Sequence, residues 1–174
     1  RLNNRKRKPG IDGRSEEILF GFNSVFEALR AGRRKIFEIS VSKERSGEKL
    51  QKFLSDAGLP QIRTTSISHE QMTALTKSEM NQGIAARVSP FRTYDFDDLA
   101  DIVPIGRNTL YLILDSIEDP HNFGALCRTA LAAGVDAVIV PKDRAAGPTP
   151  SVSRVSAGAL EHLKVVTVTN IVNS

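Results

Sequence analysis

Residues 110–141 read "LYLILDSIEDPHNFGALCRTALAAGVDAVIVP" and decide the fold. The apolar runs at 110–115 and 136–141 have the length of strands, and the small-residue segment 122–134 between them suits a helix. A further helix is predicted at 151–163 and a strand at 165–169. Strands that are apolar on both faces and alternate with helices are typical of a parallel sheet covered on both sides. Residues 109–174 are therefore predicted to form a parallel-sheet α/β domain.

A second alternation of helices and strands occupies residues 16–89. Ser24 with Glu27, and Ser68 with Gln71, have the spacing of capping boxes at helix starts, and Gly32 is a predicted left-handed helix end. A further helix is predicted at 47–58, and strands are predicted at 36–41, 61–67 and 82–89. This stretch is expected to form a small α/β sandwich domain.

Residues 90–108 interrupt both patterns with Pro90, Pro104 and Gly106 around one acidic, helix-like turn. The segment is predicted to be a linker with a short helix, or else the first element of the second domain. The composition allows both domains a core, because 40% of the 174 residues are hydrophobic.

Composition excludes several classes of protein. Crossing a bilayer takes about 20 consecutive apolar residues, and the longest apolar runs here are far shorter, so no membrane contact is expected. A single cysteine, Cys127, excludes an intrachain disulfide and a cysteine-cluster metal site. The N-terminus has no apolar core of a secretory signal. A cytoplasmic protein without a bound metal is expected.

Positive charge is concentrated in residues 1–15, a segment without aromatic residues. Such a segment is predicted to be disordered on its own. The cluster Arg5, Lys6, Arg7 and Lys8 is a candidate for binding phosphates. The alternative is a tail that only improves solubility.

Ligands of open parallel sheets bind beyond the carboxyl ends of the strands, and the loop at 115–124 lies there. Asn122 is a candidate helix N-cap, although its amide can also face outward, and Gly124 would let a backbone or a ligand approach closely. Arg128 is the only charged residue between 122 and 135, which suggests a partly buried anion site. The alternative is an ordinary helix with a surface arginine.

The next strand-to-helix loop, at 142–150, carries Lys142 and Arg144, which are candidates for binding phosphate at a helix N-terminus. The alternative is a solvated loop. The small residues of "SAGA" at 156–159 would let another backbone pack closely, and the alternative is ordinary contact between a helix and the sheet. Dinucleotide, P-loop and serine-hydrolase motifs are absent from the sequence.

The stretch "LDSIEDPHNFGALCRTALAAGVDAVIVPKDRAAGPTPSVSRVSAGALEHLKVVTVTN" at 114–170 closely resembles the SpoU/TrmH family of SPOUT RNA methyltransferases. The stretches "GFNSVFEALRAGRRKIFEISVSK" at 21–43 and "NQGIAARV" at 81–88 resemble the substrate-binding domain of the branch that acts on ribosomal RNA. The resemblance implies an S-adenosylmethionine-dependent enzyme that methylates a ribose 2′-OH, in a guanosine of large-subunit ribosomal RNA.

The resemblance also implies residue roles. Asn122 matches the asparagine of the family's first motif, and Arg128 matches its catalytic arginine. The two later motifs, which complete a trefoil knot and hold the cofactor, have no match here, so cofactor residues are expected beyond Ser174 and the chain resembles a methyltransferase truncated within its catalytic domain. A homodimer is implied, for which 122–134 and 151–160 are candidate surfaces. The alternative function is a non-catalytic RNA-binding or ribosome-assembly module.

Overall fold

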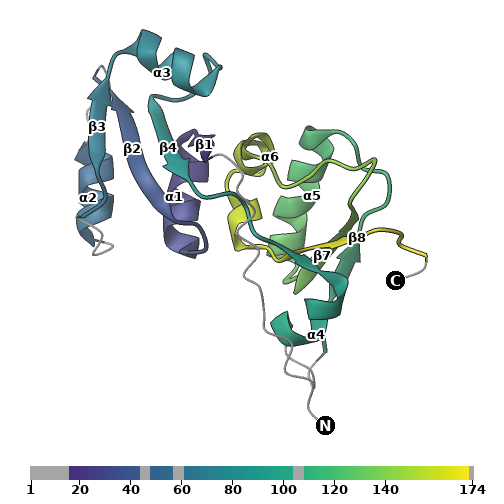
Figure 1. Ribbon diagram of the computed structural model, residues 1–174. Helices are drawn as coiled ribbons and strands as arrows, with labels where there is room; N and C mark the ends of the chain where they lie inside the picture. The colour runs from purple at the N-terminus through teal and green to yellow at the C-terminus, as the bar shows by residue number, and fades with distance from the viewer. Residues whose placement is uncertain (1–15, 44–47, 57–60, 104–107, 173–174) are drawn as a thin grey trace.

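The computed structural model describes residues 16–43, 48–56, 61–103 and 108–172, which form two halves side by side, each built on one sheet (Figure 1). The basic segment with Arg5, Lys6, Arg7 and Lys8 lies outside the described residues. Within the described part, no helix is long and apolar enough to cross a membrane.

The first half is a four-stranded sheet with the order β1-β4-β2-β3. The central strand β4 pairs antiparallel with β1 and β2, and β2 pairs parallel with β3. Its elements are β1 (Glu17–Phe20), α1 (Phe22–Ala31), β2 (Ile36–Ser42), α2 (Glu48–Asp56), β3 (Thr64–Ile67), α3 (His69–Thr76) and β4 (Ile84–Val88). Leu19, Phe26, Ile39 and Leu54 share one core between this sheet and helices α1 and α2. The expected α/β arrangement is present, with the additional strand β1.

The two predicted capping boxes of this half have different outcomes. Ser68 caps α3 as expected, because its hydroxyl accepts from Gln71 N–H and the Gln71 side chain accepts from Ser68 N–H. The box at Ser24 is wrong: α1 starts at Phe22, and Ser24 is buried inside the helix. The side chain of Gln82, 60 residues further on, accepts the Phe22 N–H at 2.7 Å. The end of α1 at Gly32 is confirmed, with a φ of 61°.

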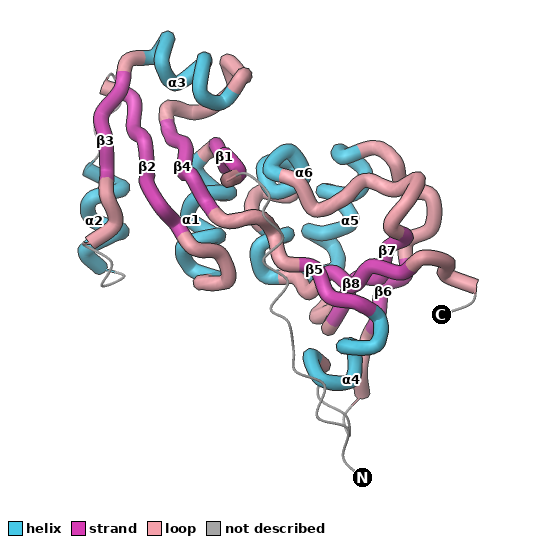
Figure 2. The backbone as a smooth tube through the Cα atoms, viewed as in Figure 1, coloured by secondary structure: helices cyan, strands magenta, loops and turns pink. Residues whose placement is uncertain are grey.

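The second half contains an all-parallel sheet with the order β5-β8-β7-β6. Figure 2 shows these strands gathered together in magenta, away from the strands of the first sheet. Its elements are β5 (Thr93–Asp95), a 3-10 turn η1 (Phe96–Asp98), α4 (Leu99–Ile102), β6 (Tyr111–Ile113), α5 (Pro120–Ala132), β7 (Ala137–Pro141), α6 (Pro150–Val155), a 3-10 turn η2 (Ala159–His162) and β8 (Val165–Val168). The parallel sheet predicted from 110–141 is confirmed.

Two clusters of apolar side chains cover the two faces of this sheet. Phe123 and Leu160 belong to the core shared with α5, α6 and η2. On the other face, Ile139 and Val166 pack with Leu99 and Ile102 of α4. Strand β6 departs from the expectation, because on this second face Tyr111 and Ile113 are 38% and 55% exposed. Both faces of β7 and β8 are therefore covered, whereas one face of β6 is exposed.

The segment at 90–108 contributes directly to the second half. Its strand β5 pairs with β8 through Thr93–Val165, Tyr94–Val166 and Asp95–Thr167. The short helix expected there is α4. Of the two interpretations left open by the sequence, the structure shows the first element of the second sheet.

The single helix expected at 151–163 is divided into α6 and η2. Ala157 and Gly158 between them have left-handed backbones, with φ values of 52° and 83°. A Cβ on Gly158 would lie 2.7 Å from the carbonyl oxygen of Asn23 in α1. The chain turns here because another backbone approaches it, as the small residues of "SAGA" suggested, and that backbone comes from the first half.

Charged contacts connect the halves. Arg34, which follows α1, lies 2.9 Å from Glu17 and 3.0 Å from Glu161 of η2, and the side chains of Arg34 and Glu161 are each 1% exposed. His162 lies 2.8 Å from Glu27 of α1. Burial raises the pKa of Glu161, and the charge of Arg34 offsets this only in part. The two halves are therefore docked through a desolvated ion pair.

Candidate active site

Helix α5 begins at the carboxyl end of β6, and Asp119 sets its first residue. The Asp119 carboxylate accepts the His121 N–H at 3.0 Å, and its carbonyl accepts the Phe123 N–H at 3.0 Å. Pro120 occupies the first helical position, where a missing N–H costs nothing. Of the two roles open to the Asn122 amide, helix capping is therefore excluded, because the cap lies three residues earlier.

Asn122 and Arg128 both lie on the outer face of α5 and are exposed. Residues six apart on a helix are separated by about 9 Å along the axis and about 120° around it. No hydrogen bond joins the two side chains in the structure, and the exposed Ala125 lies between them. The partly buried anion site expected at Arg128 is not found, because no described segment packs over this face.

The opposite face of α5 fixes the orientation of the helix. Phe123, Cys127 and Ala130 are buried in the core, and burial raises the pKa of the Cys127 thiol to about 12. A Cβ on Gly124 would lie 2.9 Å from Val155 Cγ1 of α6. Gly124 therefore allows α5 and α6 to pack closely. Because the buried face of α5 is fixed in the core, Arg128 on the opposite face points outward.

The loop at 142–149 lies beside the loop that precedes α5, because Ala146 N–H donates to the Ile117 carbonyl at 2.6 Å. Lys142 pairs with Asp95 at 3.0 Å, so a phosphate would have to compete with that carboxylate. Arg144 is exposed and has a φ of 55°. Of the two cations predicted in this loop, Arg144 is the one that no described carboxylate neutralises.

A cavity of about 270 Å³ adjoins the start of α5 between the two halves. Arg154 lines it, lies 5.4 Å from the ring centre of Phe20, and has a buried Nε without a hydrogen-bond partner among the described residues. The lining residues are Gly21, Asn23, Ser24, Met80, Gln82, His121, Arg154 and Val155. The sequence alone does not reveal this cavity, because most of its wall comes from residues 21–82.

The resemblance implies S-adenosylmethionine as the cofactor. The cavity is smaller than the roughly 300 to 1,000 Å³ of typical ligand pockets, so it does not fit this molecule. No residue that lines this cavity is therefore assigned to such a cofactor. Three or more His, Cys, Asp or Glu side chains placed to hold a metal do not occur in the described ranges.

Two family models match the chain and together span most of it. Residues 18–94 match the model described as RNA 2′-O ribose methyltransferase substrate binding, and residues 109–174 match that of the SpoU rRNA Methylase family. The chain is 39% identical over 162 residues to a 23S rRNA (guanosine-2′-O-)-methyltransferase RlmB of Vibrio vulnificus, and 40% identical over 160 residues to that of Photobacterium profundum. Each alignment covers 90% of this chain and 64% of the relative.

Solved structures share the fold. The SpoU methyltransferase AviRb from Streptomyces viridochromogenes, in complex with AdoMet, superposes with a TM-score of 0.69 at 24% identity and covers 91% of this chain and 57% of its own. An AdoMet-bound rRNA methyltransferase from Sinorhizobium meliloti gives 0.68 at 19% identity, with the same coverage. With its two matching halves and these relatives, the chain belongs to the SpoU rRNA methylase family.

Proposed function

We propose that the protein containing this chain transfers a methyl group from S-adenosylmethionine to a ribose 2′-OH of ribosomal RNA, in a guanosine of the large subunit. The observation that carries this proposal is the exposed Arg128 on α5, in the segment that matches the SpoU model. The names of the relatives support the reaction and the RNA. The AdoMet in two structural neighbours supports the methyl donor.

Arg128 would bind and orient the reacting nucleotide. Its planar guanidinium can hold a phosphate through two parallel hydrogen bonds, and nothing in the described chain covers it. A guanidinium is a poor base, so the hydroxyl proton would pass to water or to a phosphate oxygen. Asn122 would hydrogen-bond the ribose. Holding the hydroxyl in line with the methyl carbon would supply much of the rate.

S-adenosylmethionine supplies the methyl group when bound. The described cavity at α5 does not fit it, so no step is assigned to a cofactor residue of this chain. The 2′-OH itself explains the choice of RNA, since DNA lacks it. Arg144 and the segment Arg5, Lys6, Arg7 and Lys8 would add phosphate contacts, and Lys142 would do so after leaving Asp95.

The test is single-turnover methylation of ribosomal RNA by the whole protein and its variants. Arg128→Ala should abolish methyl transfer and leave RNA affinity nearly unchanged, because the side chain acts at the reacting nucleotide. Arg128→Lys should fail as well, because a point charge cannot replace the planar fork. Arg63→Gln, which removes an exposed arginine from the far edge of the first sheet, is the control. If Arg128→Ala turned over within a few-fold of the wild-type rate, the proposal would be contradicted.

We also propose that the protein acts as a homodimer through the outer face of α5. This face exposes small and apolar side chains, namely Ala125, Thr129, Leu131 and Ala132 around Arg128. The prediction that residues 151–160 form a second dimer surface is wrong, because most of them are buried against α5 and the first half. Light scattering on the whole protein should give the mass of two chains, and a monomeric mass for an active sample would contradict this.

A further inference from the structure

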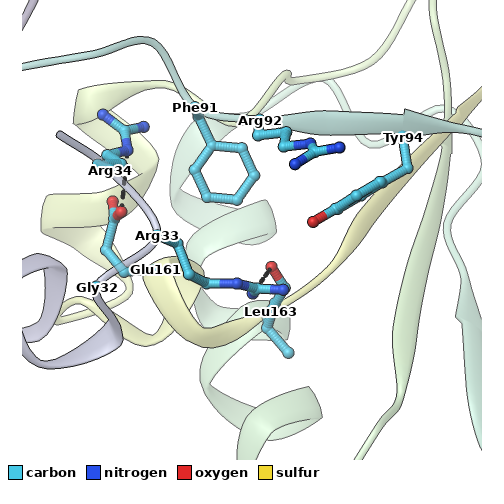
Figure 3. A pocket seen from close by; sticks show the side chains of 8 residues that line it. All are labelled: Gly32, Arg33, Arg34, Phe91, Arg92, Tyr94, Glu161 and Leu163. Atoms are coloured by element: carbon cyan, nitrogen blue, oxygen red, sulfur yellow. Dashed lines mark hydrogen bonds and ion pairs between the residues drawn. The ribbon is translucent and has the colours of Figure 1, made fainter. Parts of the chain in front are cut away.

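A second cavity, of about 280 Å³, lies on the junction between the two halves, and we call it the junction pocket. Its walls come from the turn after α1, from the segment leading into β5, and from η2 (Figure 3). The lining residues are Gly32, Arg33, Arg34, Phe91, Arg92, Tyr94, Glu161 and Leu163. No residue of α5 lines it, so it is distinct from the face that carries Arg128.

Two of its arginines are available to an anion. Arg33 donates to the Leu163 carbonyl at 2.8 Å, which holds its guanidinium in place, and Arg92 lies 4.9 Å from the ring centre of Tyr94. Both are exposed, and neither forms an ion pair with any carboxylate that the structure describes. Arg34 and Glu161 neutralise each other in the buried wall. The pocket therefore keeps the positive charge of Arg33 and Arg92.

Aromatic rings lie beside these cations. Figure 3 shows Phe91, Arg92 and Tyr94 projecting from one stretch of chain, with Arg33 across the pocket from them. Phe91 and Tyr94 are half-buried. The guanidinium of Arg34 lies over the Phe91 ring, 5.1 Å from the ring centre. Flat apolar rings next to uncompensated guanidinium groups are what unstacked bases and their phosphates bind in single-stranded RNA.

We propose that the junction pocket binds one unstacked nucleotide of a single-stranded RNA segment, with its base against Tyr94 and Phe91 and its flanking phosphates on Arg33 and Arg92. The proposal rests on the proposed function for the choice of RNA. The volume lies just under the roughly 300 Å³ at the lower end of ligand pockets, so it suits a single base. Because both halves build its walls, the pocket exists only while they are docked.

RNA binding by the intact 174-residue chain tests the assignment, with a short labelled single-stranded RNA and fluorescence anisotropy. Tyr94→Leu should weaken binding by roughly 5- to 150-fold, the effect of losing one base–aromatic stack. Arg92→Gln should flatten the slope of log K against log salt by about 0.7, the share of one phosphate contact in single strands. Arg63→Gln is the charge-matched control, and it should keep both affinity and slope.

Tyrosine fluorescence gives a direct readout at the pocket. The chain has no tryptophan and two tyrosines, Tyr94 and Tyr111. In Tyr111→Phe all tyrosine emission comes from Tyr94, and RNA should quench it if a base stacks there. In Tyr94→Leu the remaining emission comes from Tyr111 and should not change.

Three results would overturn the assignment. The first is equal RNA affinity of wild type, Tyr94→Leu and Arg92→Gln, and the second is the absence of any RNA binding. The third is binding of free GMP as tight as that of RNA, since a mononucleotide lacks the second flanking phosphate. These experiments measure RNA binding and not methyl transfer. If Arg128→Ala still methylated RNA, the proposed function would be contradicted, but the assignment of the junction pocket would be unaffected.

Discussion

Asp119 shows how a single side chain sets the position of α5. Its carboxylate satisfies the His121 N–H, one of the backbone donors that a helix start leaves without a partner. Asp119→Ala should lower the free energy of unfolding by about 1 kcal/mol, the usual effect of losing an N-cap. Urea denaturation followed by circular dichroism measures the change.

Asn122→Ala is the matched control on the same helix turn. Because Asn122 is exposed and makes no capping bond, its loss should shift stability by no more than about 0.5 kcal/mol. If Asn122→Ala were the more damaging change, the capping role would belong to Asn122 as its sequence position suggested.

Local patterns predicted helix starts only where the partner lies nearby in sequence. Ser68 and Gln71 satisfy each other, so their spacing was sufficient evidence. Ser24 has the same spacing, but Gly21 and the distant Gln82 determine where α1 begins. Asn122 and Arg128 were singled out from local patterns, and the resemblance to a family added their roles; both are exposed, as the alternative of a surface arginine had it for Arg128.

At the scale of elements, Gly158 separates α6 from η2. It has a φ of 83°, and an added Cβ would lie 2.6 Å from Glu27 Cβ. Gly158→Ala should cost about 1 kcal/mol or more for the left-handed backbone and about 1 to 3 kcal/mol for the overpacking against α1. Thermal and urea unfolding measure the sum.

Gly134→Ala separates these two causes. Gly134 has a φ of 72°, and nothing lies within 4 Å of its added Cβ, so this variant should show only the backbone cost. Equal destabilisation by the two substitutions would mean that contact with α1 contributes nothing at Gly158.

Strongly apolar elements were predictable, and the short strands that begin each sheet were not. The strands around α5 follow from their apolar runs, because burial on both faces of a parallel sheet demands them. Strands β1 and β5 have four and three residues, too few to show a period. The division at Ala157 and Gly158 has its cause in α1, more than 120 residues earlier, so the sequence of 151–163 alone suggests one helix.

At the scale of the whole molecule, the contact between Arg34 and Glu161 holds the halves together. Removing one partner of a buried pair leaves the other charge desolvated, which typically costs about 3 to 5 kcal/mol. Arg34→Met should therefore lower the free energy of unfolding by about 3 kcal/mol at neutral pH. Arg34→Met with Glu161→Leu should recover most of the loss, because no buried charge then remains.

The pH dependence follows from the raised pKa of Glu161. The folded protein holds this proton more tightly than the unfolded chain, so the contribution to stability is present below the ordinary carboxyl pKa of 4.5 and is lost as pH rises through the raised value. Arg34→Met removes the charge that opposes the shift. Its deficit relative to wild type should narrow as pH falls toward 4.5 in urea titrations, and a deficit that stays constant with pH would contradict this account.

The junction between the halves could not be predicted from the sequence. Arg33 and Arg34 follow the end of α1, where cations are favourable, and nothing near them in the chain points to Glu161 or Leu163, which lie about 130 residues away. The domain order and the α5 motif were predictable because they are local. The pockets require the docking of two separately patterned segments, and that information is spread over the chain.

The strand order implies a sequence of events during synthesis. Strand β4 is the last strand of its sheet to be made and yet lies between β1 and β2, so the first sheet closes only after its final strand appears. Strand β5 follows almost at once, but its partner β8 is the last of the described strands to be made. At about 5 to 20 residues per second, β5 waits for several seconds. During that interval the surface of α1 that η2 later covers is exposed, while the chain is still attached to the ribosome. Ribosomal RNA, which the names of the relatives give as their substrate, then lies beside it.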